Sequence, residues 1–369
     1  MNNKNFQICF DCSFSKVRAG AFNVNKINEA FYAESKFFRD HLNLEPEIQK
    51  IITSFEKDTN EYIDNINLMI DSPKMLSIAM SISKKLDGSK LRQTNIQFLI
   101  QEAKQQILKY YTNYNIAHII INNYKIDDVD YSYLPDEIEC HFISLDIIFI
   151  CLPSDLVLYF KKIFSNSNIS VNQIICSSYA KSINYKDNLN LNGHLSFIDI
   201  GFNKTSVISY FNNKILSLDV LPVGGNYITK DISKVLNIDL EKSEQIKLNF
   251  DKNYRDLNDK DLPIETLQKI IFYRIDEILE LCLKSLELNL FVPERFKILL
   301  MGNGSKILGN HPKDNIFFSN DIDYLADTLE DICQSGFKFG TQPNNQEVMV
   351  VPKKHIKHDF FERFFHFFK

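Results

Sequence analysis

Two aspartates, Asp11 and Asp199, each stand near the end of an apolar run and are followed by small or polar residues. An apolar run of this length is typical of a buried strand, and the backbone N–H groups of a tight turn after it can cradle phosphate. A carboxylate at the strand end can hold Mg²⁺ through its water ligands. If both turns face one cleft, the pattern predicts a site for a phosphorylated ligand.

The two aspartates belong to a repeated stretch. Residues 8–27 align without gaps with residues 196–215, and this alignment pairs Asp11 with Asp199 and Lys16 with Lys204. Both copies predict three short strands separated by a tight turn and an Asn-rich turn, and self-similarity of this kind indicates a duplicated unit. The alternative is two unrelated β-hairpins. Duplication predicts two similar domains that face each other across a cleft.

Composition sets the outer limits. A chain of 369 residues is long enough for two to three domains, and a net charge of −5 gives no reason to expect nucleic-acid binding. The chain has seven cysteines without regular spacing, and it has no segment that resembles a signal peptide. This combination predicts free thiols in a reducing cytoplasm. Cys9 and Cys12 form a C-x-x-C, but residues three apart on a strand point to opposite faces, which favours two core thiols over a zinc site.

The spacing of apolar residues predicts the elements between these turns. Helices are expected at 45–55, at 95–111 with a capping box of Thr94 and Gln97, after Pro153, and at 264–290. Strands are expected at 27–38, 66–70, 118–122, 140–151, 169–176 and 296–301. The polar stretch 184–193 is interpreted as the crossing to the second domain, and the glycine pair at 224–225, before a helix, favours an anion near its N–H groups.

These elements predict the following division of the chain. Residues 1–66 and 152–190 form a first core domain, with a small α+β unit, 67–151, inserted in it. Residues 191–222 and 276–340 form a second core domain, and 223–275 its outer subdomain. Residues 341–352 are a linker, and 353–369 a terminal helix.

That terminal segment carries a separate signal. On a helix, seven apolar residues fall within about half of the circumference: Ile356, Phe360, Phe361, Phe364, Phe365, Phe367 and Phe368. A phenylalanine-rich face flanked by lysines is typical of a helix that lies in the plane of an anionic membrane. The alternative is a terminal helix docked on the protein's own core.

A glycine turn supplies the third loop, because strand 296–301 runs into Gly302-Asn303-Gly304-Ser305, which is either a helix cap or a place of close ligand approach. With these loops the chain resembles the actin-like ATPase superfamily and, within it, the bacterial cell-division FtsA family, over nearly its whole length. The resemblance implies an α/β actin-like fold of two duplicated RNase H-like domains around a nucleotide cleft, with an FtsA-type inserted subdomain and a C-terminal amphipathic helix.

The resemblance also implies ATP as ligand, with Asp11 and Asp199 as catalytic residues and as Mg²⁺ holders through water. It places nucleotide contacts on Ser13, Phe14, Ser15, Lys16, Gly201, Phe202, Asn203, Lys204, Thr205, Gly224, Gly225, Glu244, Lys247, Gly302, Asn303, Gly304 and Ser305. The chain departs from the family at Ser13-Phe14, where Gly-Thr or Gly-Ser is usual, and at Phe202-Asn203-Lys204, where glycines and a small hydroxyl residue are expected. Side chains then stand where bare backbone approaches phosphate, so ATP hydrolysis is expected to be slow or absent.

The resemblance implies an actin homologue of bacterial cell division that self-assembles, binds the C-terminal peptide of the tubulin-like FtsZ, and attaches to anionic lipids on the cytoplasmic face of the inner membrane at the septum. Arg274 matches the family's peptide-binding arginine, and with Glu277 and Ile278 it is expected to form one patch. The alternative is a structural role, in which Arg274 only pairs with Glu277 or Asp276 on a solvated face. Other functions on the same fold are a pilus-assembly actin homologue and, with less to favour it, a metabolite kinase or chaperone.

Overall fold

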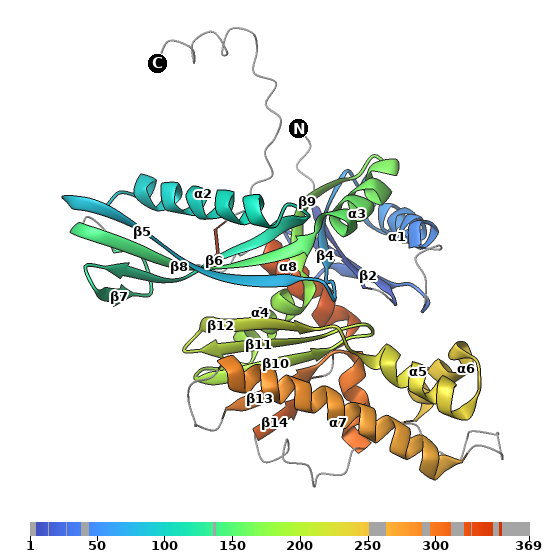
Figure 1. The fold of residues 1–369 in the computed structure, drawn as a ribbon. Coiled ribbons are helices and arrows are strands. Elements are labelled where there is room, and N and C mark those ends of the chain that lie inside the picture. The colour runs from blue at the N-terminus through green and yellow to red at the C-terminus, as the bar shows by residue number, and fades with distance from the viewer. Residues whose placement is uncertain are drawn as a thin grey trace.

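The computed structural model describes residues 5–13, 15–26, 28–37, 44–135, 138–250, 263–289, 296–310, 321–325, 327–341 and 347–348. Within them, two five-stranded sheets have the same strand order (Figure 1). The first runs β3 (Ala30–Glu34), β2 (Val17–Asn23), β1 (Phe6–Cys12), β4 (Asn65–Ile70), β9 (Ser170–Cys176). The second runs β12 (Lys214–Leu221), β11 (Thr205–Phe211), β10 (His194–Ile200), β13 (Lys297–Met301), β14 (Asp321–Tyr324). The predicted duplication of an α/β unit is therefore confirmed.

Helices cover the outer faces of the two sheets and fill the space between them. Helices α1 (Leu44–Thr59) and α3 (Ser154–Asn166) pack on the first sheet, and α7 (Ile264–Asn289) packs on the second. Helices α5 (Gly225–Leu236) and α6 (Leu240–Asn249) stand beside α7, while α4 (Ser177–Asn188) and α8 (Leu329–Thr341) lie between the two halves (Figure 1). A short 3₁₀ helix, η3 (Asn303–Asn310), follows β13.

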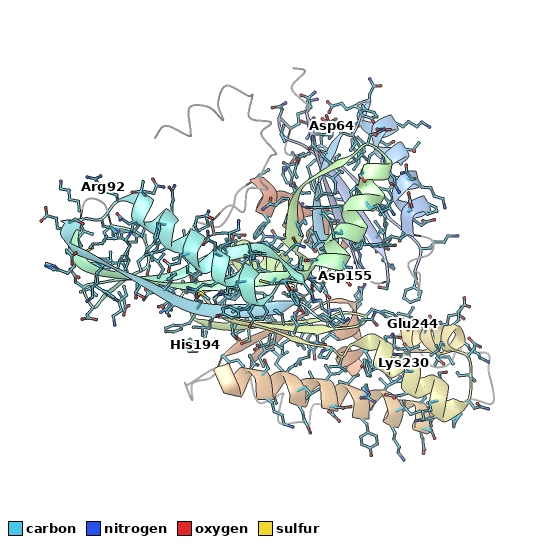
Figure 2. The ribbon with its side chains drawn as sticks, turned by 45° about the horizontal axis from the view of Figure 1, so that its top comes forward. Asp64, Arg92, Asp155, His194, Lys230 and Glu244 are labelled. Atoms are coloured by element: carbon cyan, nitrogen blue, oxygen red, sulfur yellow. The ribbon has the colours of Figure 1, made fainter. Side chains whose placement is uncertain are left out.

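The inserted unit is a four-stranded antiparallel sheet covered by one helix. It consists of β5 (Leu76–Lys90), α2 (Gln93–Tyr110), β6 (Tyr114–Ile126), β7 (Val129–Tyr131) and β8 (Glu139–Pro153). In β8, Ile147 and Phe149 pack under α2, whereas Ile148 and Ile150 join the core of the first half. Successive side chains of a strand point to opposite faces, so this apolar run is buried on both sides. Figure 2 shows Arg92 at the outer tip of the unit, away from α5 and α6, where Lys230 and Glu244 are labelled.

Strand β10 has the same two-sided burial, and this fixes the direction of its aspartate. Phe197 belongs to the core that contains α4 and α8, whereas Ile198 belongs to the core beneath α7. Because side chains two apart on a strand share a face, Asp199 points to the same side as Phe197. The register of β1 with β2 places Asp11 opposite Arg18 in the first half.

Several predicted boundaries differ from the structure. Strand β4 pairs with β1 and β9, so the insert begins after Ile70 and not at 67. Helix α7 is continuous across the predicted boundary between 275 and 276. Helix α4 occupies part of the stretch 184–193 that the sequence presented as a crossing. The first turn of α2 is capped by Asn95, whose side chain accepts from the N–H of Arg92, and not by the predicted Thr94 and Gln97 box.

The cysteines follow the prediction. All seven, Cys9 and Cys12 included, are buried free thiols. Burial raises the pKa of Cys9 and of Cys12 well above the usual thiol value, which makes both side chains core groups rather than nucleophiles.

Candidate functional site

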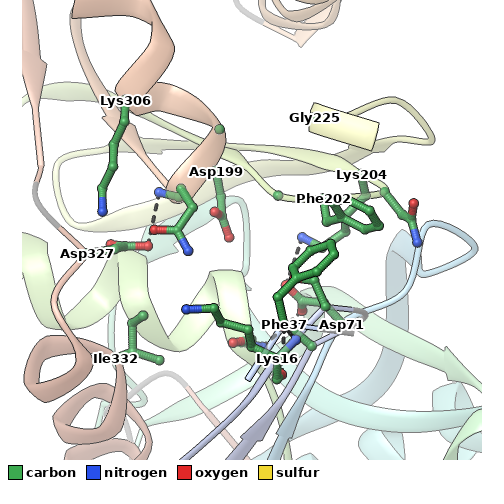
Figure 3. A pocket seen from close by; sticks show the side chains of 18 of the residues that line it. Lys16, Phe37, Asp71, Asp199, Phe202, Lys204, Gly225, Lys306, Asp327 and Ile332 are labelled. Carbon is green, nitrogen blue, oxygen red and sulfur yellow. Dashed lines mark hydrogen bonds and ion pairs between the residues drawn. The ribbon is translucent and has the colours of Figure 1, made fainter. Parts of the chain in front are cut away.

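A cavity of about 630 Å³ opens where β1 and β10 end (Figure 3). The cavity is lined by most of the residues that were predicted from the sequence to contact a ligand: Asp11, Ser13, Ser15, Lys16, Asp199, Gly201, Phe202, Asn203, Lys204, Gly225, Glu244, Lys247, Gly302, Asn303 and Gly304. Thr205, Gly224 and Ser305 stand behind this wall, and Phe14 lies outside the described residues. The fold thus brings the three predicted loops and α6 to one cavity.

Asp11 is held by a cation from its own hairpin. The Arg18 guanidinium lies 3.1 Å from Asp11 Oδ2, and the Ser177 hydroxyl donates to Oδ1 at 2.6 Å. Burial raises the pKa of Asp11, although Arg18 and Ser177 act in the opposite direction. Burial would lower the pKa of Arg18, but Asp11 and Glu34 outweigh it, so Arg18 stays charged.

Asp199 takes its cation from a helix of the other half. Lys181 of α4 places its Nζ 3.0 Å from Asp199 Oδ1 and 2.7 Å from Asp327 Oδ2. Asp327 also accepts from the Tyr185 hydroxyl at 2.8 Å and from the Gly302 N–H at 3.0 Å. Burial opposes both charges, but the pairing prevails: the pKa of Lys181 is raised and that of Asp199 is lowered. Lys181 and Asp199 are therefore both ionised.

A third ion pair links the second loop to the first half. Lys204 Nζ lies 2.7 Å from Asp71 Oδ2, directly after β4 (Figure 3), and also donates to the Ser206 hydroxyl. Asp71 accepts the backbone N–H groups of Ser177 and Ser178 at 2.9 and 3.0 Å, so it caps α4. Burial would lower the pKa of Lys204, but Asp71 and then Asp199 raise it.

These pairs decide whether the predicted metal fits. Asp11 and Asp199 were expected to hold Mg²⁺ through water, which requires carboxylate oxygens that are free to accept from metal-bound waters. Arg18 and Ser177 each donate to one oxygen of Asp11, and Lys181 donates to one of Asp199, which leaves fewer of their lone pairs for metal-bound water. A dication would also stand beside buried, charged Arg18 and Lys181, which repel it. The residues present do not fit a divalent metal on these two carboxylates.

The second loop is closed by its own backbone. Gly201 donates to the carbonyl of Lys204 at 2.9 Å, and the Gly225 and Asn226 N–H groups donate to Gly201 and Phe202 at 3.0 and 2.7 Å. A Cβ on Gly224 would lie 2.5 Å from the Gly201 oxygen. The glycine pair before α5 therefore serves close packing of helix against loop, and the N–H groups of Gly225 and Asn226 at the helix start already have backbone partners.

The replaced glycine position carries an aromatic contact across the cleft. The rings of Phe202 and Phe37 meet edge to face, with centroids 5.4 Å apart at 80° (Figure 3). Lys247 lies 5.5 Å from the Phe202 ring and 2.8 Å from Glu244 Oε2. Glu244 and Lys247, predicted to contact ribose, are thus both buried and paired with each other at the cavity wall.

The third loop approaches β10 closely. Gly302 has a φ of +85°, and a Cβ there would lie 2.5 Å from both Asp199 Oδ1 and the Ile200 oxygen. The Ser305 side chain turns inward and donates to the Gly302 carbonyl at 2.7 Å. Glycine is therefore required by conformation and by contact, and Ser305 closes the turn rather than lining the cavity.

Several site residues escaped the sequence analysis. Arg18, Asp71, Ser177, Lys181 and Asp327 all line the cavity and supply or accept its ion pairs. The hairpin register offered one signal, because the strand partner of Asp11 is Arg18. The other four come from elements far away in sequence, and their local patterns carried no sign of a site.

The surface of α7 keeps part of the predicted partner patch. Arg274 pairs with Glu277 and with Asp231 of α5, at 2.6 Å for the latter, and its guanidinium lies 5.6 Å from the Tyr227 ring. Ile278 is only 2% exposed and packs in the core beneath α7, so it is not part of any surface patch. The patch consists of Arg274 and Glu277, joined by groups of α5.

The predicted terminal helix, 353–369, lies outside the described residues. None of the described helices is long and apolar enough to cross a membrane.

Comparison with known proteins gives the sequence its context. The family model "Cell division protein FtsA" matches residues 196–280. Among curated FtsA proteins, that of Neisseria meningitidis is 32% identical over 129 residues, 30% of this chain and 31% of that protein. That of Buchnera aphidicola is 27% identical over 158 residues, 42% of this chain and 37% of that one. That of Agrobacterium fabrum is 19% identical over 285 residues, 72% of this chain and 64% of the relative. The matches thus span less than two thirds of these relatives' length.

Solved structures place the fold. A protein of the PilM-PilN type IV pilus biogenesis complex superposes with a TM-score of 0.64 at 12% identity, over 90% of this chain and 95% of that one. The ethanolamine utilization protein EutJ from Carboxydothermus hydrogenoformans gives 0.50 at 10% identity, over 90% and 89%. At such identities the likeness concerns the fold alone. The chain has the actin-like fold, and its sequence is similar to that of the cell-division protein FtsA.

Proposed function

We propose that this protein is an FtsA-like actin homologue of bacterial cell division, which binds ATP in the cleft, self-assembles, and tethers FtsZ to the cytoplasmic membrane at the division site. One observation carries the proposal: the segment that matches the FtsA model, 196–280, builds the β10–β11 wall of the cavity, α5, α6 and the Arg274 surface of α7. The matched part therefore includes both the ligand cavity and the expected partner surface.

The cavity supports nucleotide binding by its size and lining. A volume of about 630 Å³ is within the range of small-molecule sites. Loops from β1, β10 and β13 meet at one end, and Glu244 and Lys247 stand on the wall formed by α6. In this arrangement the loops after β1 and β10 hold the phosphate chain, the loop after β13 contacts the adenosine, and the α6 pair contacts the ribose.

Hydrolysis is proposed to be slow or absent. A water that attacks the terminal phosphate must be oriented by a group with a free acceptor. Asp11 is held in its orientation by hydrogen bonds from Arg18 and Ser177, which leave it fewer lone pairs for such a water, and Phe202 fills the turn where bare backbone is usual. The cleft is therefore built for holding a nucleotide rather than turning it over.

The partner is proposed to be the acidic C-terminal peptide of FtsZ. Arg274 is half-buried on α7 and paired with Asp231 and Glu277, with the Tyr227 ring beside it. Membrane attachment is assigned to 353–369 on its residue pattern. The pilus-assembly alternative has the PilM-PilN likeness in its favour, which concerns the fold alone.

One reconstitution tests the proposal. The full chain is mixed with phosphatidylglycerol-containing vesicles and fluorescent FtsZ, and vesicle-bound FtsZ is measured by sedimentation. We expect recruitment by the parent and none by a chain ending at Pro352. Arg274→Glu should weaken binding of an FtsZ tail peptide by about 10-fold or more, because it reverses one member of an interfacial charge pair.

A matched control is Lys230→Glu, which reverses a charge on α5 beside the same Tyr227 ring. If this variant loses the peptide as strongly as Arg274→Glu, the effect is general electrostatics and not docking. If the parent recruits no FtsZ but retains vesicle binding, cell-division tethering is excluded and the pilus-assembly function takes its place.

A further inference from the structure

Each of the four carboxylates at the bottom of the cleft is paired with a protein cation, and three cations serve them. Asp11 pairs with Arg18 and Asp71 with Lys204, and Lys181 bridges the other two, Asp199 and Asp327. Both lysines and the arginine are buried, as are three of the four aspartates. Protein cations thus already stand where a phosphate site would hold a metal ion.

These cations retain donors for a ligand. A lysine ammonium has three N–H donors, and Lys181 uses one on Asp199 and one on Asp327. Lys204 likewise donates to Asp71 and Ser206. Both line the cavity, so the third donor of each can reach a phosphate oxygen placed there. Arg18, which also lines it, uses Nε and Nη1 on Glu34 and Asp11 and keeps further N–H donors.

From this arrangement we infer that the cleft takes its nucleotide without a divalent cation, with the remaining N–H donors of Lys181, Lys204 and Arg18 contacting the phosphate chain in the metal's place. The inference rests on the proposed function, since it names the ionic form of the ligand of that same site. A lysine does this as a point charge, and it keeps its carboxylate partner while it binds phosphate, so no ion pair has to be broken.

Calorimetric titration of the full chain with ATP, in excess EDTA and in millimolar Mg²⁺, tests the inference. The two dissociation constants should agree within about threefold. In EDTA, Lys181→Ala should bind ATP about 10-fold or more weakly than the parent. Mg²⁺ should restore part of this loss, because Asp199 and Asp327 then lack their counter-ion and can attract a cation.

The matched control is Lys186→Ala. Lys186 lies on the same helix and is equally buried, but it stands over the Tyr210 ring and does not line the cavity. Its ATP affinity should equal that of the parent in both buffers. If Lys181→Ala does not fold, the parent comparison and Lys204→Gln, expected to show the same new Mg²⁺ dependence, decide the matter.

The outcomes separate the two proposals. Binding by the parent only in Mg²⁺ overturns the inference and leaves nucleotide binding in place. Binding in neither buffer removes nucleotide binding itself and with it the inference. Equal binding in both buffers, together with a Mg²⁺ requirement created by Lys181→Ala, supports both.

Discussion

The two halves of the molecule share a backbone plan but satisfy their aspartates in different ways. In β1–β2, Asp11 stands opposite Arg18, whereas in β10–β11 Asp199 stands opposite Ser206 at the equivalent position. The first hairpin therefore contains its own counter-ion. The second has a hydroxyl there, and it takes its cation, Lys181, from α4 of the other half.

The paired lysines of the repeat differ in the same sense. Lys16 is 29% exposed and pairs with Glu34 of its own sheet, whereas Lys204 is buried and pairs with Asp71 after β4 of the other half. Duplicated strands have kept their register, while the charges at their ends have diverged. The second half is thus tied to the first by ion pairs that cross the cleft.

The largest difference between the two halves is expected in the unfolding free energy when the lysine of each repeat is replaced by alanine. Lys204→Ala leaves Asp71 without its cation, and loss of one member of a buried pair costs about 3–5 kcal/mol. Lys16→Ala breaks a partly exposed pair and should cost under about 1 kcal/mol of unfolding free energy. Urea denaturation of both variants measures the difference. Equal losses would show that the cross-cleft pair contributes no more than a surface pair.

Glycine replacement in the third loop ranks next. Gly302→Ala should destabilise by about 1–2 kcal/mol for its positive φ and about 1–3 kcal/mol more for the clash with Asp199 and Ile200. Gly193→Ala is the matched control, because its φ is +86° but nothing lies within 4 Å of an added Cβ. Gly193→Ala should therefore lose only the stability that the positive φ accounts for. Identical shifts in melting temperature for the two variants would mean that the third loop accommodates the added Cβ without a free-energy penalty.

Asp199 and Asp11 should contribute to the pH dependence of folding stability with opposite signs. The pKa of Asp199 is lowered in the fold, so its stabilisation is present above its ordinary value of 3.8 and is lost as the pH falls through the folded value. The pKa of Asp11 is raised, so its ionisation costs stability as the pH rises from 3.8 through the folded value. The unfolding free energy should therefore rise less steeply with pH in Asp199→Asn than in the parent below about pH 5. In Asp11→Asn it should rise more steeply.

Guanidinium unfolding at a series of pH values measures both slopes. The effect on each is smaller than that of the lysine replacements, because the Asn variants keep a hydrogen-bonding group in place. If both variants changed the slope in the same direction, the different pairing of the two halves would not be the cause.

The sequence revealed the repeated hairpins because their evidence is local. Alternating apolar residues and turn residues mark β1, β2, β10 and β11, and self-similarity adds the second copy. Strand β5 was missed because much of it is polar and half exposed, and it becomes a strand only by pairing with the apolar run of β8. Such pairing is a tertiary effect that no local window contains.

Helix α4 was hidden for the opposite reason. Its polar residues, among them Lys181 and Asn184, look solvated in the sequence but are buried between the two halves. The partners that permit this burial, such as Asp199 and Asp327, come from distant strands and loops. The candidate loops were therefore predictable, and the cations that neutralise them were not.

The smallest expected effect concerns the aromatic contact that also crosses the cleft. Phe37 follows β3 of the first half, and its ring meets Phe202 of the second at 5.4 Å. A double-mutant cycle of Phe37→Leu and Phe202→Leu should give a coupling energy of about 0.5–1.5 kcal/mol, near the low end because Phe37 is partly exposed. The stacked pair Phe22 and Phe337, at 4.4 Å and away from the cavity lining, is the reference.

Repeating that cycle with ATP present sharpens the comparison of the halves. A ligand that fills the cavity beside Phe202 must either keep the two rings together or part them, and only a change in their contact alters the coupling. We expect the coupling to change on ATP addition for Phe37 and Phe202 and to stay constant for Phe22 and Phe337. An unchanged value for the first pair would leave the ion pairs alone as the ties that respond to nucleotide.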